Sequence, residues 1–275
     1  MTEATEDWPP QGIDGSVPST ARVYNAVLGG QDNFKVDRDA AEFFVRRIPQ
    51  VRECARENRR ALLRGVEYLV RRAGVDQIID IGCGLPTAPN THEVAQAIDP
   101  GARVVYVDND PMVLSHGRAL MSTDDSTRVV TADLRDPEAI LSHPDVRSFL
   151  DFDRPVAVII AATIVQVSEH EDPDGILKAL MGPLAPGSHL FLTVWPDTGE
   201  PVQRLLSQAC LETLGSGWIR PVERLREHFA GLEMVPPGLE YLARWFPEEP
   251  GRAVPAVEDL EPFERAQMAG IAKKP

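Results

Sequence analysis

Two glycines, Gly82 and Gly84, directly follow a short run that contains three isoleucines and Asp80. A glycine backbone can approach a ligand where any Cβ would collide, so this spacing is typical of a nucleotide-binding turn. The residues before the turn, Gln77–Ile81, have the β-branched composition of a buried parallel strand. The sequence therefore predicts a strand that leads into a nucleotide-binding loop.

A second group of acids follows one helix and one strand later. The helix is expected over His92–Ile98 and the strand over Arg103–Val107, after which come Asp108 and Asp110. Strand, glycine turn, helix, strand and acid is the order of a ribose-binding site, because a carboxylate there accepts hydrogen bonds from the sugar hydroxyls. Asp108 could instead cap the next helix, but the two residues after it can provide that cap. We therefore assign the ribose to Asp108.

The composition is that of an ordinary globular protein, with 275 residues, 43% hydrophobic and 25% charged. This length allows one large α/β domain with additions, or one domain and a small lobe. No run approaches the roughly 18 apolar residues of a membrane-spanning helix. The acidic N-terminus also lacks the apolar core of a signal peptide. We expect a cytoplasmic protein with no membrane partner.

The net charge and the cysteine pattern argue against nucleic-acid binding, a disulfide scaffold and a zinc site. The net charge of −14 opposes binding to phosphate backbones. Basic residues cluster between Arg46 and Arg72, but glutamates interleave with them on the expected helix, which is typical of a solvated, salt-bridged face. Three scattered cysteines predict neither a disulfide framework nor a zinc site. We expect no nucleic acid, no metal and a small-molecule substrate; a homodimer remains one alternative for the oligomeric state.

The first part of the chain predicts helices. Residues 1–18 are expected to be a flexible N-terminus, because they contain few core-forming residues. Residues 19–74 are expected to form a helical region ahead of the first strand. Its three helices run from a cap at Ser19 or Thr20 to Leu28, over Arg38–Arg47 after a cap at Asp37, and from Pro49 to about Ala73.

Residues 75–275 alternate between strands and helices. Beyond the first two strands, further strands are expected over Arg128–Ala132, Pro155–Thr163 and Ser188–Val194. Two later segments, Leu232–Val235 and Glu240–Trp245, predict a hairpin that closes the sheet edge. This alternation implies a doubly wound, mostly parallel α/β sheet with right-handed crossovers.

Two long sequence motifs and several short ones resemble those of a known protein family. They are Ala21–Asn25 with Leu28–Phe34, Asp80–Glu93, Asp108–Pro111, Leu184–Ser188 and Phe229–Glu233. These motifs resemble those of an actinobacterial family of class I S-adenosylmethionine-dependent methyltransferases, which was formerly catalogued as a domain of unknown function. The resemblance covers nearly everything after residue 18. It implies a Rossmann-like, seven-stranded, mostly parallel sheet over residues 75–275, and it makes residues 19–74 a lid over the cofactor.

The resemblance also implies roles for individual residues toward S-adenosylmethionine. Asp80 would receive the ammonium group, and the N-terminus of the following helix would receive the carboxylate. Asp133 would bind the adenine amine and Leu134 the ring face, although Asp133 could instead cap the next turn. The complete set of expected cofactor residues is Tyr24, Gly30, Asp32, Asn33, Asp80, Gly82, Gly84, Asp108, Asn109, Asp133, Leu134 and Ala162.

Three positions depart from the patterns that the resemblance supplies. Pro86 replaces the third glycine of the general class I pattern. Gln166 lies after the fourth strand, where the family usually has a His-Phe pair, and Trp195 ends the fifth strand, where a Ser-His pair is expected. The last two lie at carboxyl ends of strands, where an open α/β sheet binds its substrate. Gln166 and Trp195 are therefore the expected substrate-binding residues.

The leading hypothesis is in-line methyl transfer to a small actinobacterial metabolite. A dry, rigid site would supply most of the catalysis, because the sulfonium loses its charge in the transition state. No general base is assigned, because many transfers need none once the acceptor is positioned. His170 and Tyr24 are candidate catalytic residues, although a solvated acidic loop also accounts for His170. The alternatives are cyclisation or another group transfer, a non-catalytic cofactor-binding module, and a nicotinamide-dependent dehydrogenase, which typically needs a glycine where Thr87 stands.

Overall fold

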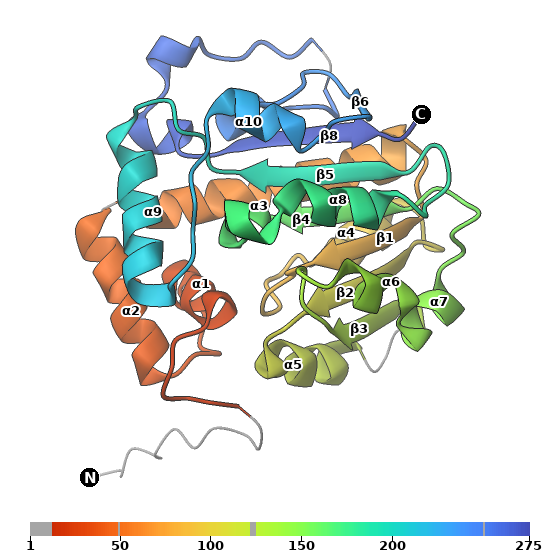
Figure 1. Cartoon of the computed structure of the whole chain (residues 1–275), viewed down its shortest axis with the longest axis horizontal. Coiled ribbons are helices and arrows are strands. Elements are labelled where there is room, and N and C mark those ends of the chain that lie inside the picture. The colour runs from red at the N-terminus through yellow and green to blue at the C-terminus, as the bar shows by residue number, and fades with distance from the viewer. Residues whose placement is uncertain (1–12, 49, 122–124, 250) are drawn as a thin grey trace.

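A single eight-stranded sheet organises this computed structural model, which describes residues 13–48, 50–121, 125–249 and 251–275 (Figure 1). The strand order is β3-β2-β1-β4-β5-β8-β6, and β7 pairs with β8. The strands are β1 (Gln77–Ile81), β2 (Arg103–Asp108), β3 (Thr127–Thr131), β4 (Ala157–Ala161), β5 (His189–Val194), β6 (Glu233–Met234), β7 (Glu240–Tyr241) and β8 (Met268–Lys273).

The five strands β1–β5 are parallel, and β8 runs antiparallel to β5, β6 and β7. Their apolar side chains alternate between two cores, as the pleat requires. In β1, Ile78 faces one core and Ile79 the other. In β4, Ile159 and Ile160 divide in the same way. Both faces of the sheet are therefore covered, which explains the nearly continuous apolar character of these strands.

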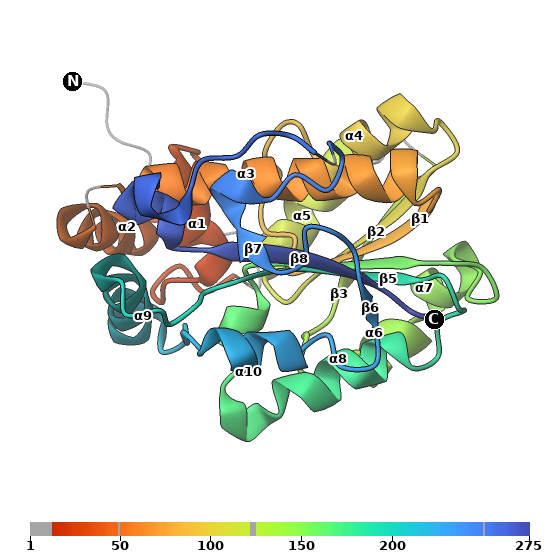
Figure 2. The same cartoon turned by 90° about the horizontal axis from the view of Figure 1, so that it is seen from above.

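Helices cover the two faces as separate layers (Figure 2). One layer contains α3, α4 and α5, and the other contains α6, α7, α8 and α10, while α1, α2 and α9 pack beyond one end of the sheet. The helices are α1 (Thr20–Leu28), α2 (Lys35–Arg47), α3 (Val51–Glu67), α4 (Thr91–Ile98), α5 (Pro111–Met121), α6 (Pro137–Ser142), α7 (Pro144–Phe149), α8 (Pro173–Met181), α9 (Pro201–Leu214) and α10 (Val222–Glu227).

The predicted α/β class is confirmed, with a doubly wound and mostly parallel sheet. Several helices and strands begin or end a few residues away from their predicted bounds. Helix α2 begins at Lys35, because Asp37 lies inside its first turn and accepts the N–H of Phe34. Helix α7 was not predicted. Most of the predicted flexible N-terminus, residues 1–12, and the predicted helix start at Pro49 lie outside the described residues. Ile13 packs against Phe34 in a small apolar cluster.

The predicted hairpin is wrong. Its two segments form β6 and β7, but each pairs with β8 and not with the other. The strand β8 escaped the sequence analysis because half of it is Ala269, Gly270 and Ala272, which give little strand signal. A side chain at Gly270 would meet the Phe229 ring at 3.0 Å, so the small residue serves packing here.

Helix α3 lies along the sheet and carries two different faces. Its buried stripe includes Leu62 and Val66, and its exposed face has the predicted ion pairs, such as Arg56 with Glu53. Gly65 allows a close approach to the sheet, because a Cβ there would lie 2.9 Å from Cε1 of the Phe191 ring.

Substitution Gly65→Ala is expected to destabilise the protein by about 1–3 kcal/mol. Alanine is the better helix former by roughly 1 kcal/mol, but the Phe191 ring is fully buried and stacked on Trp245, so it cannot move aside. Urea unfolding monitored by circular dichroism measures the change. Arg56→Ala on the exposed face is the control, and it should shift the free energy of unfolding by less than about 0.5 kcal/mol. A Gly65→Ala variant more stable than the wild type would contradict this packing.

Candidate functional site

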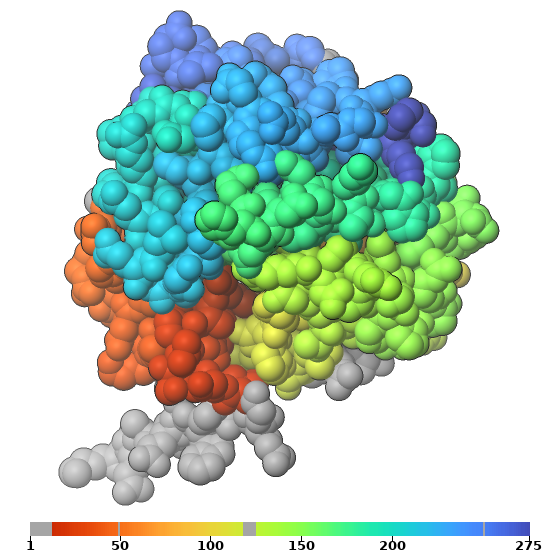
Figure 3. Space-filling model, in the orientation of Figure 1, coloured from red at the N-terminus to blue at the C-terminus, as the bar shows by residue number. Residues whose placement is uncertain are grey.

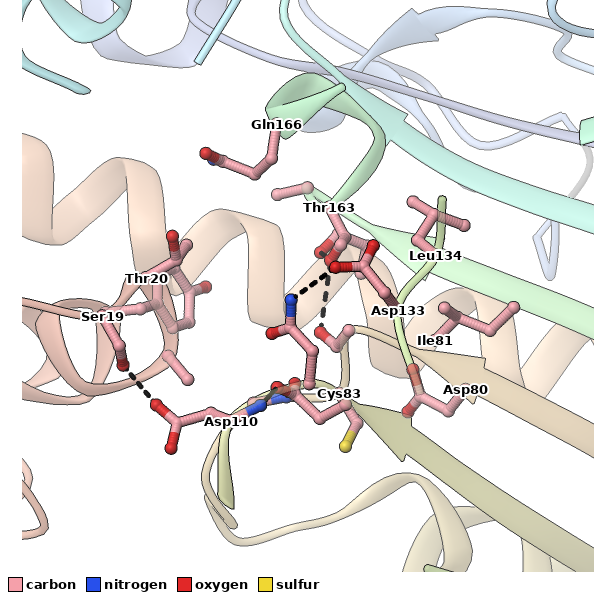
Figure 4. A pocket seen from close by; sticks show the side chains of 18 of the residues that line it. Ser19, Thr20, Asp80, Ile81, Cys83, Asp110, Asp133, Leu134, Thr163 and Gln166 are labelled. Atoms are coloured by element: carbon pink, nitrogen blue, oxygen red, sulfur yellow. Dashed lines mark hydrogen bonds between the residues drawn. The ribbon is translucent and has the colours of Figure 1, made fainter. Parts of the chain in front are cut away.

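A cavity of about 300 Å³ lies where the parallel strands end at their carboxyl termini. The chain segments after β1, β2, β3 and β4 line it on the sheet side, α1 and α3 line it on the helical side, and Ser216 lines it from the segment after α9. Figure 4 shows side chains around this space from three strand ends: Asp80 from β1, Asp133 after β3, and Thr163 and Gln166 after β4. This is the position at which open α/β sheets bind ligands.

The glycine loop is held against the end of β4. Gly82 and Gly84 both have positive φ, 69° and 68°, which glycine adopts without strain. A Cβ on Gly82 would lie 2.1 Å from Oγ1 of Thr163, and that hydroxyl donates to the Gly82 carbonyl at 3.2 Å. The first glycine therefore lets the loop pack on β4, while the backbone of the loop lines the cavity.

Asp108 joins this loop to the next strand. One of its carboxylate oxygens accepts the N–H of Gly84 and the other that of Asp110, both at 2.9 Å. The side chain is largely buried, and burial raises the pKa of Asp108 against the effect of these hydrogen bonds. Each oxygen keeps a second lone pair, so the carboxylate can still accept hydrogen bonds from a diol in the cavity. The cap of α5 is provided by Asp110, which accepts the N–H of Met112 at 2.8 Å.

Asp80 is 3% exposed and lies in the lining of the same cavity. Its Oδ2 accepts the hydroxyl of Thr91 at 2.7 Å, and burial raises its pKa to about 6. Cys83 lines the cavity between the two glycines, where burial and the nearby carboxylates of Asp108 and Asp80 raise the pKa of its thiol well above the usual value. The thiol therefore stays protonated at neutral pH and is a poor nucleophile.

Asp133 and Asn109 lie together beyond Asp108. The Asn109 amide donates to Asp133 at 2.9 Å, and the backbone N–H of Arg135 donates to the other oxygen at 2.9 Å. Burial opposes the charge of Asp133, but these bonds and the Arg135 guanidinium together hold its pKa below the ordinary value. Leu134 is buried beside it and gives this end of the cavity an apolar wall. Ala162 also lines the cavity, with a positive φ of 59°.

Helix α1 lines the cavity and is held in place by a buried charge cluster of Arg22, Asp37 and Asp110. Nε of Arg22 lies 3.2 Å from Asp37 and 3.9 Å from Asp110. The Ser19 hydroxyl donates to Asp110, as Figure 4 shows, and the Ser19 N–H donates to Asp37 at 3.1 Å. In the space-filling view, α1 lies close beside α5 on this face (Figure 3). The cluster therefore connects α1, α2 and the segment after β2.

The far side of the cavity is lined by neutral polar groups. Tyr24 donates its hydroxyl to the Ala55 carbonyl at 2.9 Å, and burial raises its pKa. The Ser216 hydroxyl donates to Oε1 of Gln166. The segment that carries Gln166 is fixed by Arg135, which donates to the Gln166 carbonyl at 2.9 Å.

Some expected residues lie outside the cavity lining. Gly30, Asp32 and Asn33 follow α1, where the Asn33 amide donates to Asn25 at 2.8 Å. Trp195 is buried in the core. His170 is exposed, on a 3₁₀ turn whose neighbouring Glu169 and Glu171 pair with arginines. The remaining expected cofactor residues and Gln166 line the cavity together.

The sequence analysis missed several lining residues, among them Asn58, Arg59, Thr163 and Ser216. One signal was present, because a polar residue at position 58 interrupts the apolar stripe of α3. Its amide oxygen accepts the Thr193 hydroxyl at 2.6 Å. Ser216 lies between two glycines far along the chain, and no local pattern connects it with the site.

Two negative findings apply to the described residues alone. Within them, no cluster of histidine, cysteine, aspartate or glutamate side chains is arranged to bind a metal ion. No described helix is both long and apolar enough to span a bilayer.

Comparisons with known proteins identify a family for this chain. The model of a family described as S-adenosyl methyltransferase matches residues 6–275. A crystal structure of a candidate methyltransferase from Thermobifida fusca is 49% identical, covers 98% of this chain and 99% of its own, and has a TM-score of 0.91. A DUF574 family protein from Streptomyces avermitilis is 33% identical over 95% of this chain and 99% of its own, with a TM-score of 0.86.

A more distant structure supports the fold alone. It is an O-methyltransferase family protein from Burkholderia thailandensis, 13% identical over 83% of this chain and 61% of its own, with a TM-score of 0.52. None of the curated proteins compared with this chain matches it.

The buried charge cluster leads to a stability prediction. Arg22→Met would leave Asp37 and Asp110 buried without their cation, and it should destabilise the protein by about 3–5 kcal/mol. Chemical denaturation measures this. Arg46→Met removes the exposed pair with Glu42 and should change the free energy of unfolding by at most about 0.5 kcal/mol. Equal effects of the two substitutions would show that the cluster contributes nothing beyond a surface pair.

Proposed function

The chain belongs to the S-adenosyl methyltransferase family, and we propose that it methylates a small-molecule acceptor by in-line displacement within this cavity. S-adenosylmethionine is its methyl donor. One observation carries the proposal: a glycine loop, two buried carboxylates and a neutral polar wall line the same cavity at the strand ends.

The residues present fit this cofactor. Asp80 has an uncommitted carboxylate oxygen for the ammonium group, next to the backbone of Gly82 and Gly84. The free lone pairs of Asp108 suit the ribose hydroxyls, since a carboxylate accepts two such bonds. Asp133 and Leu134 offer an acceptor and an apolar surface for adenine. These assignments follow the order of the strands β1, β2 and β3 across the sheet.

The acceptor would lie against the neutral wall of Tyr24, Gln166 and Ser216. Oε1 of Gln166 accepts the Ser216 hydroxyl, so the amide nitrogen is the group left to donate to an acceptor. An uncharged wall suits an acceptor that is itself uncharged at the reacting group, because a buried charge would need a partner. The volume of about 300 Å³ favours a small molecule.

The bound cofactor supplies an electrophilic methyl carbon: the acceptor forms a bond to this carbon as the carbon–sulfur bond breaks, and that electron pair stays on sulfur. The protein contributes position and exclusion of water, through α1 and the braced Gln166 segment. Tyr24 is a poor base, because its raised pKa keeps the phenol protonated. His170 lies outside the cavity lining. We therefore propose that the acceptor proton passes to water.

An acceptor screen tests this function. The protein is incubated with methyl-labelled S-adenosylmethionine and small molecules bearing hydroxyl, phenol, amine or carbon nucleophiles, and products are read by mass spectrometry. One class should gain the label, with an equal amount of S-adenosylhomocysteine. Asp108→Ala should bind the cofactor about 100-fold more weakly in calorimetry, whereas Asp136→Asn, at an exposed cap outside the cavity lining, should not. Label found solely in macromolecules, or a cyclised cofactor product, would refute the proposal.

Cofactor affinity should depend on pH through Asp80. Its pKa of about 6 means that the carboxylate is charged at pH 7.5 and mostly protonated at pH 5. A neutral Asp80 no longer attracts the ammonium group, so the affinity should fall by about tenfold between these values. Calorimetry at both pH values measures this. Asp80→Asn should bind weakly and with less pH dependence than the wild type, since the raised pKa of Asp108 still contributes. Asp133→Asn should keep the dependence, since the pKa of Asp133 is lowered. A pH-independent wild type would contradict the assignment.

A further inference from the structure

Arg59 is a cation that the site described so far does not use. It lies on α3 and lines the cavity described above and a smaller one next to Gly84 and Leu85. Its Nη2 donates to the carbonyl oxygens of Thr87 at 2.7 Å and Pro89 at 2.8 Å. Within the described chain, Nε and Nη1 have no hydrogen bond and no carboxylate within ion-pair distance. One edge of the guanidinium is therefore anchored, and donors remain.

The neighbouring arginines are already engaged. Arg56 and Arg60 pair with glutamates on the exposed face of α3, and Arg64 donates to two carbonyls near Trp245. Arg135, the other cation in the described cavity lining, is paired with Asp133 and Glu171. Arg59 thus combines a place in the cavity lining with uncommitted donors.

The N-terminus of α4 is the other candidate for binding a carboxylate, and much of it is occupied. The Asn90 N–H donates to Glu93, and the His92 N–H donates to the hydroxyl of Tyr106 at 2.8 Å. Glu93 in the first turn also places a negative charge there. An incoming carboxylate would meet this charge and compete for occupied donors.

Asp80 provides the complementary group close to Arg59. The charge of Arg59 acts on the Asp80 carboxyl and lowers its pKa, against the larger effect of burial. No ion pair within 4.0 Å joins the two in the described structure, so each remains available to a ligand. Both residues line the same two cavities, and a free carboxylate oxygen together with free guanidinium donors matches the two charges of an α-amino acid.

We propose that Arg59 binds the carboxylate of the methionine end of S-adenosylmethionine, while Asp80 binds its ammonium group. This inference rests on the proposed cofactor site and assigns a residue to it. Arg59 thereby makes the site selective for a cofactor that carries an intact amino acid. It also couples the loop between β1 and α4 to the ligand, because the same guanidinium holds that loop through Thr87 and Pro89.

Calorimetry with two ligands tests the assignment. S-adenosylmethionine and decarboxylated S-adenosylmethionine differ by the carboxylate alone. In the wild type, the intact cofactor should bind on the order of 10- to 100-fold more tightly. Arg59→Gln keeps a side-chain N–H for the loop carbonyls but loses the charge. It should remove this difference by weakening the intact cofactor, and leave the affinity for the decarboxylated ligand within about twofold.

Arg60→Gln is the matched control, on the same helix with an exposed pair to Glu57, and it should keep the wild-type ratio. Equal weakening of both ligands by Arg59→Gln would show that Arg59 acts on the loop alone, and would overturn the assignment. An unchanged ratio would overturn it as well. A wild type that binds neither ligand would refute the proposed cofactor site itself, an outcome distinct from a failure of Arg59.

Discussion

The hydrogen bonding of one buried carboxylate, Asp108, is the constraint on which the site depends. A charge with so little exposure is tolerated where donors compensate for lost water, and here the N–H groups of Gly84 and Asp110 provide them. The first bond fixes the glycine loop to the end of β2, and the second holds Asp110, the residue directly before α5. Since Asp110 also accepts the hydroxyl of Ser19, the position of α1 is linked to the same group.

This arrangement holds negative charge in the cavity at a cost to stability. The raised pKa values of Asp80 and Asp108 show that the folded protein disfavours their ionised forms, chiefly through burial. For Asp80, which accepts one hydrogen bond, from Thr91, an amide would serve a purely structural role as well. Carboxylates kept under such conditions are typical of functional sites, where a ligand supplies the missing interactions. The family's methyl donor is cationic at its sulfonium and ammonium groups, which suits a cavity of this sign.

Much of the fold could be predicted because its signals are local. The parallel strands are apolar and β-branched, and Ser19 and Gly29 bound the first helix in the expected way. The failures involve long-range contacts. β8 is defined by its neighbours and carries little strand signal of its own, and Trp195 ends a strand on the expected edge yet turns into the core. Arg59 was grouped with the arginines of a solvated helix face, because the sequence could not show which one contacts the glycine loop.

The placement of β8 has a consequence for how the chain folds. This strand pairs with all six residues of β5, yet α9, α10 and two short strands lie between them in the sequence. Pairings between such distant segments form late, since a long loop must close first. Until then, β5 presents a flat apolar edge that can pair with another chain. Association between chains during refolding therefore competes with the pairing of β8 and β5. A lower protein concentration favours the native pairing, because association between chains depends on concentration.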